Sequence, residues 1–287
     1  MAPVFRQLIA AIALLAAVNA CRGLDPLGSE ELARGAGEAS TFGAEESLRP
    51  PSTGVIESAI NNPRRLAADR KRDEQRRAGR VLEFFRIAPG MTVLDLFSGG
   101  GYYTELLSYA VGPAGKVVAH NNTPFTKFAQ AEIGERFNAG RLPNVERLLG
   151  ENNQLDLPPN TFDAVLMILA YHDVYFADEE IGWDKIDSPA FLAEVYTSMR
   201  PGAMLGIVDH IAAPGATVKS AQTLHRIDPE LIKRDLVKAG FVFDGSTDIL
   251  RNYKDDRDVD VFSDSVRGTT DRAVLRFVKP AGVANGG

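Results

Sequence analysis

The chain has 287 residues, 45% hydrophobic and 24% charged, which is the composition of a globular protein with one sizeable core. Its formal net charge is -6, so the overall field of the molecule opposes binding to the phosphate backbone of a nucleic acid. Cysteine occurs once, at Cys21, which excludes a disulfide within the chain. These numbers predict one main domain and no nucleic-acid partner.

The N-terminus has the pattern of a signal peptide, because Arg6 precedes an uninterrupted apolar run over residues 8–18. This run is shorter than the about 20 residues that a membrane-spanning helix needs. The residues that follow, Val18-Asn19-Ala20-Cys21, resemble a bacterial lipobox, in which the cysteine is lipidated and becomes the mature N-terminus. We therefore predict a signal peptide over residues 1–20 and an exported lipoprotein anchored through Cys21 at the periplasmic face of a bacterial membrane. The alternative is an uncleaved leader in which Cys21 is one more small apolar residue.

Residues 21–51 separate this N-terminus from the rest of the chain. They are rich in Gly, Ala, Ser and Glu and end at Pro50-Pro51, a composition typical of a flexible tether. The globular domain is then predicted to span residues 52–287.

An arginine-rich segment opens the domain. The pattern favours one helix from Pro63 to about Pro89, with apolar residues in its second half. Eight basic and three acidic residues lie within residues 64–80. We interpret them as a solvated face with ion pairs such as Asp73 with Arg77, and the alternative is a lid that attracts an anionic substrate.

Strand and helix patterns alternate through the rest of the domain, which indicates a parallel sheet covered by helices on both faces. The last two strands have no helix between them, so we expect them to pair antiparallel. The predicted strands are 92–97, 116–121, 144–147, 162–169, 204–209, 241–250 and 272–278, and predicted helices include 102–111, 191–199 and 229–239.

A glycine-rich turn follows the first predicted strand. The strand delivers Asp95, and the run from Gly99 to Gly101 lets the backbone approach a ligand at a helix N-terminus. A dinucleotide site would need a third glycine at position 104, where this chain has Thr104. The pattern therefore disfavours a nicotinamide-dependent oxidoreductase.

The spacing Asp95-x-Phe97-x-Gly99-x-Gly101 resembles motif I of class I S-adenosylmethionine-dependent methyltransferases, including the variant with Phe at the first glycine position. The resemblance implies a three-layer α/β, Rossmann-like fold with a mostly parallel seven-stranded sheet and an antiparallel last strand. The chain is also similar to uncharacterised predicted methyltransferases with signal peptides. Shared with them are Gly-Gly-Gly-Tyr-Tyr-Thr at 99–104, Tyr-His-Asp at 171–173, Leu-His-Arg-Ile-Asp at 224–228 and Thr-Asp-Arg at 270–272.

The same resemblance implies S-adenosylmethionine as cofactor and a small or medium-sized methyl acceptor. Asn121 stands where the family has an acid for the ribose hydroxyls, and an amide binds hydroxyls without the charge-assisted part. Gly150-Glu151-Asn152 resembles the family's Gly-Asp-Ala, in which the acid binds the adenine amino group, so Glu151 takes the position of that acid and Asn152 follows it. The implied cofactor residues are thus Asp95, Gly99, Gly101, Tyr102, Asn121, Glu151 and Asn152.

Histidines and aspartates gather after the predicted strands. His172 and Asp173 follow the fourth strand, and Asp209 and His210 end the fifth. We predict His172, Asp173 and His210 as catalytic or acceptor-binding residues, since a base is needed when the acceptor holds a proton. The alternative is that these side chains hydrogen-bond loops and each other. A His/Asp metal site is a third alternative, but we predict no metal ligands, because no pair has the close helical spacing of known zinc motifs.

Two long loops, at residues 171–187 and 251–270, are predicted to overhang this edge as binding loops or as solvated surface loops. The aromatic side chains Tyr175, Phe176 and Trp183 in the first loop would suit a cationic sulfonium. We expect a methyltransferase. The alternative is an exported lipoprotein that keeps the fold as a binding or envelope scaffold without catalysis, which the missing acid at Asn121 favours.

Overall fold

A computed structural model describes residues 52–281 of the chain. The predicted signal peptide, the lipidated Cys21 and the tether lie outside this range, so they stay predictions. Among residues 52–281, no helix combines the length and the apolar character that a membrane span requires.

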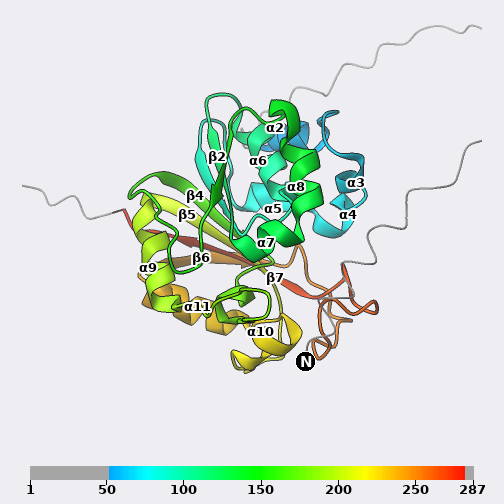
Figure 1. Ribbon diagram of the computed structural model, residues 1–287, viewed down its shortest axis with the longest axis vertical. Coiled ribbons are helices and arrows are strands. Elements are labelled where there is room, and N and C mark those ends of the chain that lie inside the picture. Colours follow the sequence, from blue (N-terminus) through cyan, green and yellow to red (C-terminus); the bar gives the residue numbers. More distant parts are fainter. Residues whose placement is uncertain (1–51, 282–287) are drawn as a thin grey trace, which may run out of the picture. The chain divides into compact units, whose positions relative to one another are not determined.

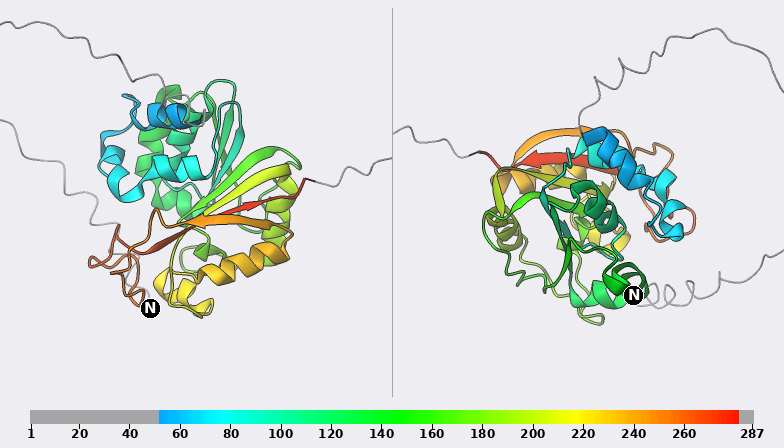
Figure 2. Two further views of the ribbon diagram at one scale, coloured as in Figure 1. Left: turned by 180° about the vertical axis from the view of Figure 1, so that it is seen from behind. Right: turned by 90° about the horizontal axis from the view of Figure 1, so that it is seen from above.

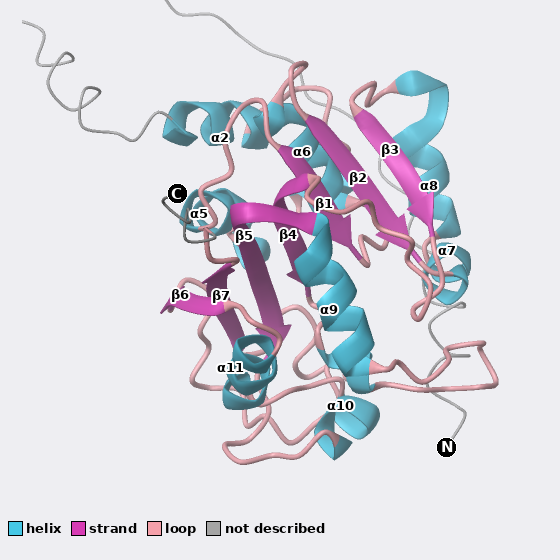
Figure 3. Cartoon of the chain, turned by 90° about the vertical axis from the view of Figure 1, so that its left-hand side faces the viewer, coloured by secondary structure: helices cyan, strands magenta, loops and turns pink. Residues whose placement is uncertain are grey.

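One seven-stranded sheet forms the centre of the domain, in the order β3-β2-β1-β4-β5-β7-β6 (Figures 1 and 3). β7 lies between β5 and β6 and runs antiparallel to both, whereas the remaining neighbours are parallel. The predicted fold class is confirmed, including the antiparallel pairing of the last two strands. The strands are β1 Thr92–Leu96, β2 Lys116–Asn121, β3 Val145–Leu149, β4 Phe162–Ile168, β5 Met199–His210, β6 Val242–Thr247 and β7 Arg272–Val278.

Helices cover both faces of this sheet (Figure 2). One face carries α2 (Ser52–Ile60), α5 (Ala78–Phe84) and α6 (Tyr102–Val111), and the other carries α9 (Ser188–Ser198) and α11 (Pro229–Lys238). The remaining helices are α3 Ala67–Arg70, α4 Asp73–Arg76, α7 Thr123–Phe128, α8 Gln130–Phe137 and α10 Lys219–Leu224, with short 3-10 turns η3 Asn138–Gly140 and η4 His172–Tyr175.

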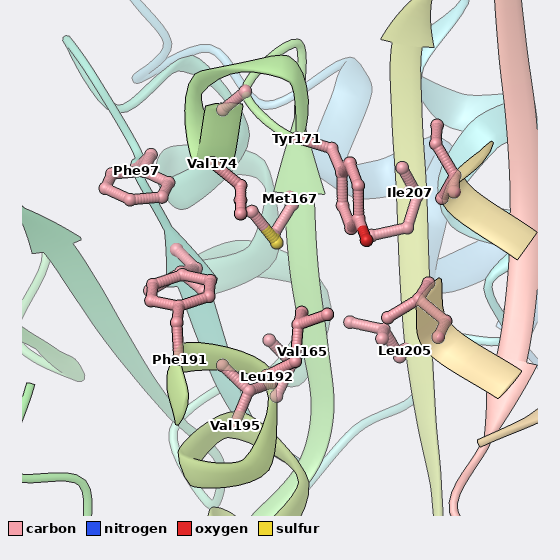
Figure 4. Close-up of a cluster of buried hydrophobic side chains, with 14 of the residues drawn as sticks. Phe97, Val165, Met167, Tyr171, Val174, Phe191, Leu192, Val195, Leu205 and Ile207 are labelled. Carbon is pink, nitrogen blue, oxygen red and sulfur yellow. The ribbon is translucent and has the colours of Figure 1, made fainter. Parts of the chain in front are cut away.

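The alternation of side chains along β1 divides the core into two layers. Val93 packs with the cluster under α5 and α6, whereas Leu94 and Leu96 belong to the cluster on the other face. In that second layer, side chains of β4, β5 and α9 interdigitate, and Phe97 faces Phe191 across it (Figure 4). The carboxyl edge of the sheet is therefore held in place by closely packed side chains.

The single helix predicted from Pro63 to about Pro89 was wrong. The segment forms α3, α4 and α5, because Arg77 adopts a left-handed conformation (φ 42°) that ends α4 and starts α5. The buried Arg65 guanidinium also folds the segment back by binding Asp73 through two hydrogen bonds of 2.8 and 2.6 Å. Asp73 therefore pairs with Arg65. Its helical spacing had suggested a pair with Arg77 instead. Helix α2, with Ile56 and Ala59 buried, was not anticipated.

Candidate active site

Asp95 fastens the turn after β1 to the helix that follows. Its carboxylate accepts a 2.5 Å hydrogen bond from Oγ1 of Thr104 in the first turn of α6, and only 2% of the residue is exposed. Burial raises the pKa of Asp95 to about 6, against the opposing hydrogen bond from Thr104. The structure thus places Asp95 beneath the turn, where it positions the glycines.

Gly99 forms the open face of the turn. Its φ is +56°, which favours glycine, and a Cβ there would meet nothing within 4 Å. The neighbouring Ser98 Oγ is buried and has no hydrogen-bond partner among the described residues. By contrast, a Cβ on Gly101 would lie 2.7 Å from Cδ of Arg136 on α8. Space for a ligand therefore opens at Gly99, while Gly101 makes room for α8.

Phe97 occupies the position where the family's motif usually has glycine, and its backbone shows why glycine is usual there. Its φ is +58°, a conformation that is strained for a side chain with a Cβ. Four aromatic rings hold it: Phe191 stacks on it at 5.8 Å, and His120, Phe125 and Trp183 lie 5.3 to 5.8 Å away. Packing energy therefore maintains a turn that glycine would form without strain.

Asn121, at the end of β2, binds the backbone of the same turn. Its Oδ1 accepts from the Gly99 N–H at 2.8 Å, and its Nδ2 donates to the Gly99 carbonyl at 2.9 Å. An aspartate could not make the second bond, because a carboxylate has no N–H to donate. This bond is a structural reason for an amide at this position. A cavity of about 250 Å³ lies beside it at the ends of β2 and β3, lined by Ala119, Asn121, Thr126, Arg147, Leu148 and Leu149.

The predicted adenine-side residues lie at the same edge. Glu151 is exposed and its carboxylate accepts a hydrogen bond from the Thr123 hydroxyl. Asn152 is buried and accepts from Nδ2 of Asn122 at 2.8 Å, and Asn122 in turn caps α7. His120 differs from the other histidines, because its Nε2 donates to the Gly150 carbonyl and its ring supports this loop.

Tyr102 begins α6 and faces the arginine-rich segment. The guanidinium carbons of Arg65, Arg72 and Arg76 lie 5.6, 5.2 and 4.6 Å from its ring centroid, and its hydroxyl donates to Asp73 at 2.6 Å. The segment therefore packs over the start of α6 through buried contacts. We had predicted a solvated face here, so these contacts are an addition to that prediction.

His172 is oriented by Asp209 across two neighbouring strands. Its Nδ1 lies 2.8 Å from Oδ1 of Asp209, and its backbone N–H donates to the other carboxylate oxygen at 2.7 Å. Burial opposes a charge on the ring, but the carboxylates of Asp209 and Asp173 outweigh it and raise the pKa of His172 to about 9. At neutral pH both ring nitrogens are therefore protonated and the ring is positively charged, unlike a histidine with its usual pKa near 6.5.

Asp173, His210 and His225 surround this ring. The His210 and His225 rings lie 6.0 and 5.4 Å from it, and Asp173 Oδ1 lies 3.5 Å from His172 Nε2. Burial and then the positive charge of His172 lower the pKa of His225 to about 3 and that of His210 well below its usual value. Burial raises the pKa of Asp173 to about 6. The structure thus brings the three predicted catalytic residues together and adds His225, which the Leu-His-Arg-Ile-Asp motif had signalled without assigning it a role.

Aromatic rings connect the turn after β1 to this cluster. Trp183 lies 5.8 Å from Phe97 and 5.9 Å from Phe176, and Phe176 lies 4.9 Å from His225. Trp183 and Phe176 are both buried in the core, and Tyr175 donates its hydroxyl to Asp235 on α11, so an aromatic wall beside a sulfonium stays a prediction.

Residues 251–270 are held against the cluster by ion pairs. The fully buried guanidinium of Arg226 binds Asp255 at 2.7 and 3.0 Å and also donates to the Val259 carbonyl. Phe262 of this loop packs on the His225 ring at 4.9 Å. The loop is thus fixed in place and covers one side of the histidine cluster.

Known proteins share this architecture. A methyltransferase of Aquifex aeolicus described as dependent on S-adenosylmethionine superposes with a TM-score of 0.51 at 23% identity, over 79% of this chain and 98% of its own. The fold is that of the class I methyltransferases. Residues 60–139, which include the turn after β1, match the family model of protein-L-isoaspartate(D-aspartate) O-methyltransferase.

Curated relatives match in part. Ubiquinone/menaquinone biosynthesis C-methyltransferases (UbiE) of Hydrogenovibrio crunogenus and Escherichia coli are 29% and 31% identical over 130 and 121 residues. These matches cover 45% and 42% of this chain, and the chain spans 46% and 43% of the relatives' length. The family model and the relatives name different acceptors and share methyl transfer, and the match to the family model ends before His172. The comparisons therefore support methyltransferase activity and S-adenosylmethionine as cofactor.

Proposed function

We propose that this protein transfers a methyl group from S-adenosylmethionine to a small acceptor bound at the carboxyl ends of β4 and β5. The observation that carries the proposal is the open Gly99 turn at the end of β1, where the Ser98 hydroxyl has no hydrogen-bond partner within residues 52–281. β1 is the parallel neighbour of β4, after which His172 follows. The turn proposed to bind the cofactor and the polar cluster around His172 therefore lie at the same edge of the sheet, after neighbouring strands.

The residues of the turn fit the cofactor. Gly99 leaves room for its close approach, Ser98 Oγ offers a free hydroxyl, and Asn121, Glu151 and Asn152 offer amide and carboxylate groups along β2 and β3. S-adenosylmethionine supplies an electrophilic methyl group on a sulfonium when it is bound. Trp183 and Phe176 extend from this turn toward the histidines, and their ring faces suit a nearby positive charge.

The acceptor side is built to handle a proton. In this proposal, His172 Nε2 donates to the acceptor atom, since Asp209 holds the ring and keeps it protonated at neutral pH. Asp173, whose pKa burial raises to about 6, would receive an acceptor proton, and the neutral His210 lies beside the His172 ring at 6.0 Å. A positive ring favours an acceptor that reacts as an anion, such as a phenol or a thiol. The names of the relatives leave a quinone precursor or a carboxylate among the acceptors to try.

Cofactor binding tests the proposal through Gly99→Leu, with Gly90→Leu as its matched control. Both glycines have positive φ (+56° and +82°) and open space at Cβ, but Gly90 precedes β1 and lies at its opposite end. The cofactor at 100 times its Kd stabilises a binding protein by about 2.7 kcal/mol, which raises the Tm of a domain of this size by roughly 5–11 °C. We expect this shift in the parent and in Gly90→Leu, and none in Gly99→Leu.

Two results would count against the proposal. If S-adenosylmethionine leaves the Tm of the parent unchanged, the turn does not bind the cofactor. If Gly99→Leu responds like Gly90→Leu, the cofactor lies elsewhere.

A binding scaffold without catalysis is the second candidate, and the observation that favours it is that the Asn121 amide already bonds both backbone groups of Gly99, where the family has an acid for the ribose. Cofactor binding without release of S-adenosylhomocysteine across phenol, thiol, carboxylate and quinol acceptors would support the scaffold. The lipid anchor predicted at Cys21 is compatible with both candidate functions, and only the sequence supports it.

A further inference from the structure

Three side chains with metal-ligating atoms converge at the carboxyl edge of the sheet. His172 and Asp173 come from the first residues of η4, after β4, and His225 follows α10. One ligand atom of each lies within 4.8 Å of the other two. His172 and Asp173 are buried and His225 is partly exposed, which leaves one side of the group accessible.

The Asp209 carboxylate fixes the orientation of the His172 ring. It accepts from the backbone N–H groups of His172 and His210, both at 2.7 Å, and only 1% of the residue is exposed. With Nδ1 held at 2.8 Å by this carboxylate, Nε2 points toward Asp173. A carboxylate behind the outer ring nitrogen is the arrangement that usually supports a histidine ligand of a metal ion.

The spacing of the ligand atoms suits a small divalent ion. Metal–ligand bonds of about 2.0–2.1 Å in tetrahedral geometry place neighbouring ligand atoms about 3.3–3.4 Å apart. His172 Nε2 and Asp173 Oδ1 are 3.5 Å apart. The His225 ligand atom lies within 4.8 Å of both, and in the described chain its ring has packing contacts with Phe176 and Phe262 but no side-chain hydrogen bond, so it is free to adjust.

The charges of the group also call for a cation. Asp173 and Asp209 are both buried, and within residues 52–281 neither forms an ion pair with a lysine or an arginine. A buried carboxylate without a cation is costly, and His172 can balance one charge only. A divalent ion would balance both.

We propose that His172, Asp173 and His225 bind one divalent transition-metal ion, with Asp209 as the positioning residue behind His172. Two imidazole nitrogens and one carboxylate oxygen suit Zn²⁺ or Co²⁺ better than Mg²⁺ or Ca²⁺, which prefer all-oxygen sites. Three protein ligands leave a position open for an acceptor oxygen or sulfur, whose pKa the ion would lower. In the metal-bound protein the ion would replace the Nε2 proton of His172, so the ion, and not this N–H group, would contact the acceptor. This site goes beyond the proposed methyl transfer, because it specifies an ion that methyl transfer itself does not require.

Co²⁺ titration of the full-length, metal-stripped protein tests the site without any S-adenosylmethionine, so its outcome is independent of the proposed function. A Cys21→Ser background removes the sole thiol as a competing ligand. We expect one Co²⁺ per chain, visible as d–d absorption, and displacement by one Zn²⁺ measured by elemental analysis. His225→Ala and Asp173→Asn should each weaken binding by more than about 100-fold, and Asp209→Asn by about 10- to 100-fold.

His210→Ala is the matched control, because this ring lies 6.0 Å from that of His172 but binds Thr270 at 2.6 Å and is outside the proposed ligand set. It should bind Co²⁺ like the parent. Circular dichroism checks the fold of each variant, and the partly exposed His225→Ala decides the matter if a buried variant does not fold. Absence of Co²⁺ binding in the parent, or unchanged affinity in His225→Ala, would overturn the site.

Discussion

Phe97 provides a sharp test of the strain at the turn after β1. Its side chain is 4% exposed and packs on four rings, so truncation to Ala should lower the free energy of unfolding by about 3–5 kcal/mol. Its φ of +58° adds a second effect, because any residue with a Cβ loses roughly 1–2 kcal/mol in this conformation. Glycine avoids that penalty but loses about 0.5–1 kcal/mol through its greater freedom in the unfolded chain.

The backbone strain and the freedom of glycine in the unfolded chain predict opposite orders of stability for the Ala and Gly variants at positions 97 and 96. At position 97, Phe97→Gly should be more stable than Phe97→Ala by roughly 1 kcal/mol. At Leu96, which is fully buried within β1, Leu96→Gly should be less stable than Leu96→Ala by about 0.5–1 kcal/mol. Leu96 therefore serves as the matched control for the loss of a large side chain.

Urea unfolding followed by circular dichroism measures the four variants, and equal m-values show that the unfolded states are comparable. The reasoning is refuted if Gly is less stable than Ala at both positions. In that case Phe97 would be retained for packing alone, and strain in the turn would contribute nothing.

Two further predictions concern buried charges. Asp255→Asn removes the carboxylate that pairs with the buried Arg226 and should lower the free energy of unfolding by about 3–5 kcal/mol. Glu146→Gln, in an exposed ion pair, is the control and should change it by less than about 1 kcal/mol. Equal losses of Tm in the two variants would contradict the role of burial. In protein free of added metal, Asp209→Asn should lower the pKa of His172 from about 9, which NMR of the ring measures. Because that pKa is raised on folding, the stabilisation from His172 is complete below about pH 6.5 and is lost as the pH rises toward 9, and a variant with the parental pH dependence would contradict the assignment.

The strands, the pairing of the last two and the position of the turn after β1 were predictable from sequence because they depend on local signals. The alternation of strands and helices gave the sheet, and the absence of a helix before Arg272 gave the antiparallel last pair. The spacing from Asp95 to Gly101 gave the position of the turn. Sequence alone also gives the only support for the signal peptide and for lipidation of Cys21.

The tertiary structure alone decided what each of these residues contacts. Spacing suggested that Asp73 would pair with Arg77, but a long-range fold brings Arg65 to it, because a left-handed Arg77 interrupts the helix. Glycine spacing likewise could not distinguish Gly99, which faces open space, from Gly101, which faces Arg136.

The histidine cluster shows the same division. The sequence placed His172 and His210 at strand ends, which topology brings to one edge of the sheet. It could not reveal that Asp209 holds the His172 ring or that His225 arrives from beyond α10, since these contacts join elements far apart in the chain. The charge on His172 follows from those contacts and from burial, and neither is a property of the residue type.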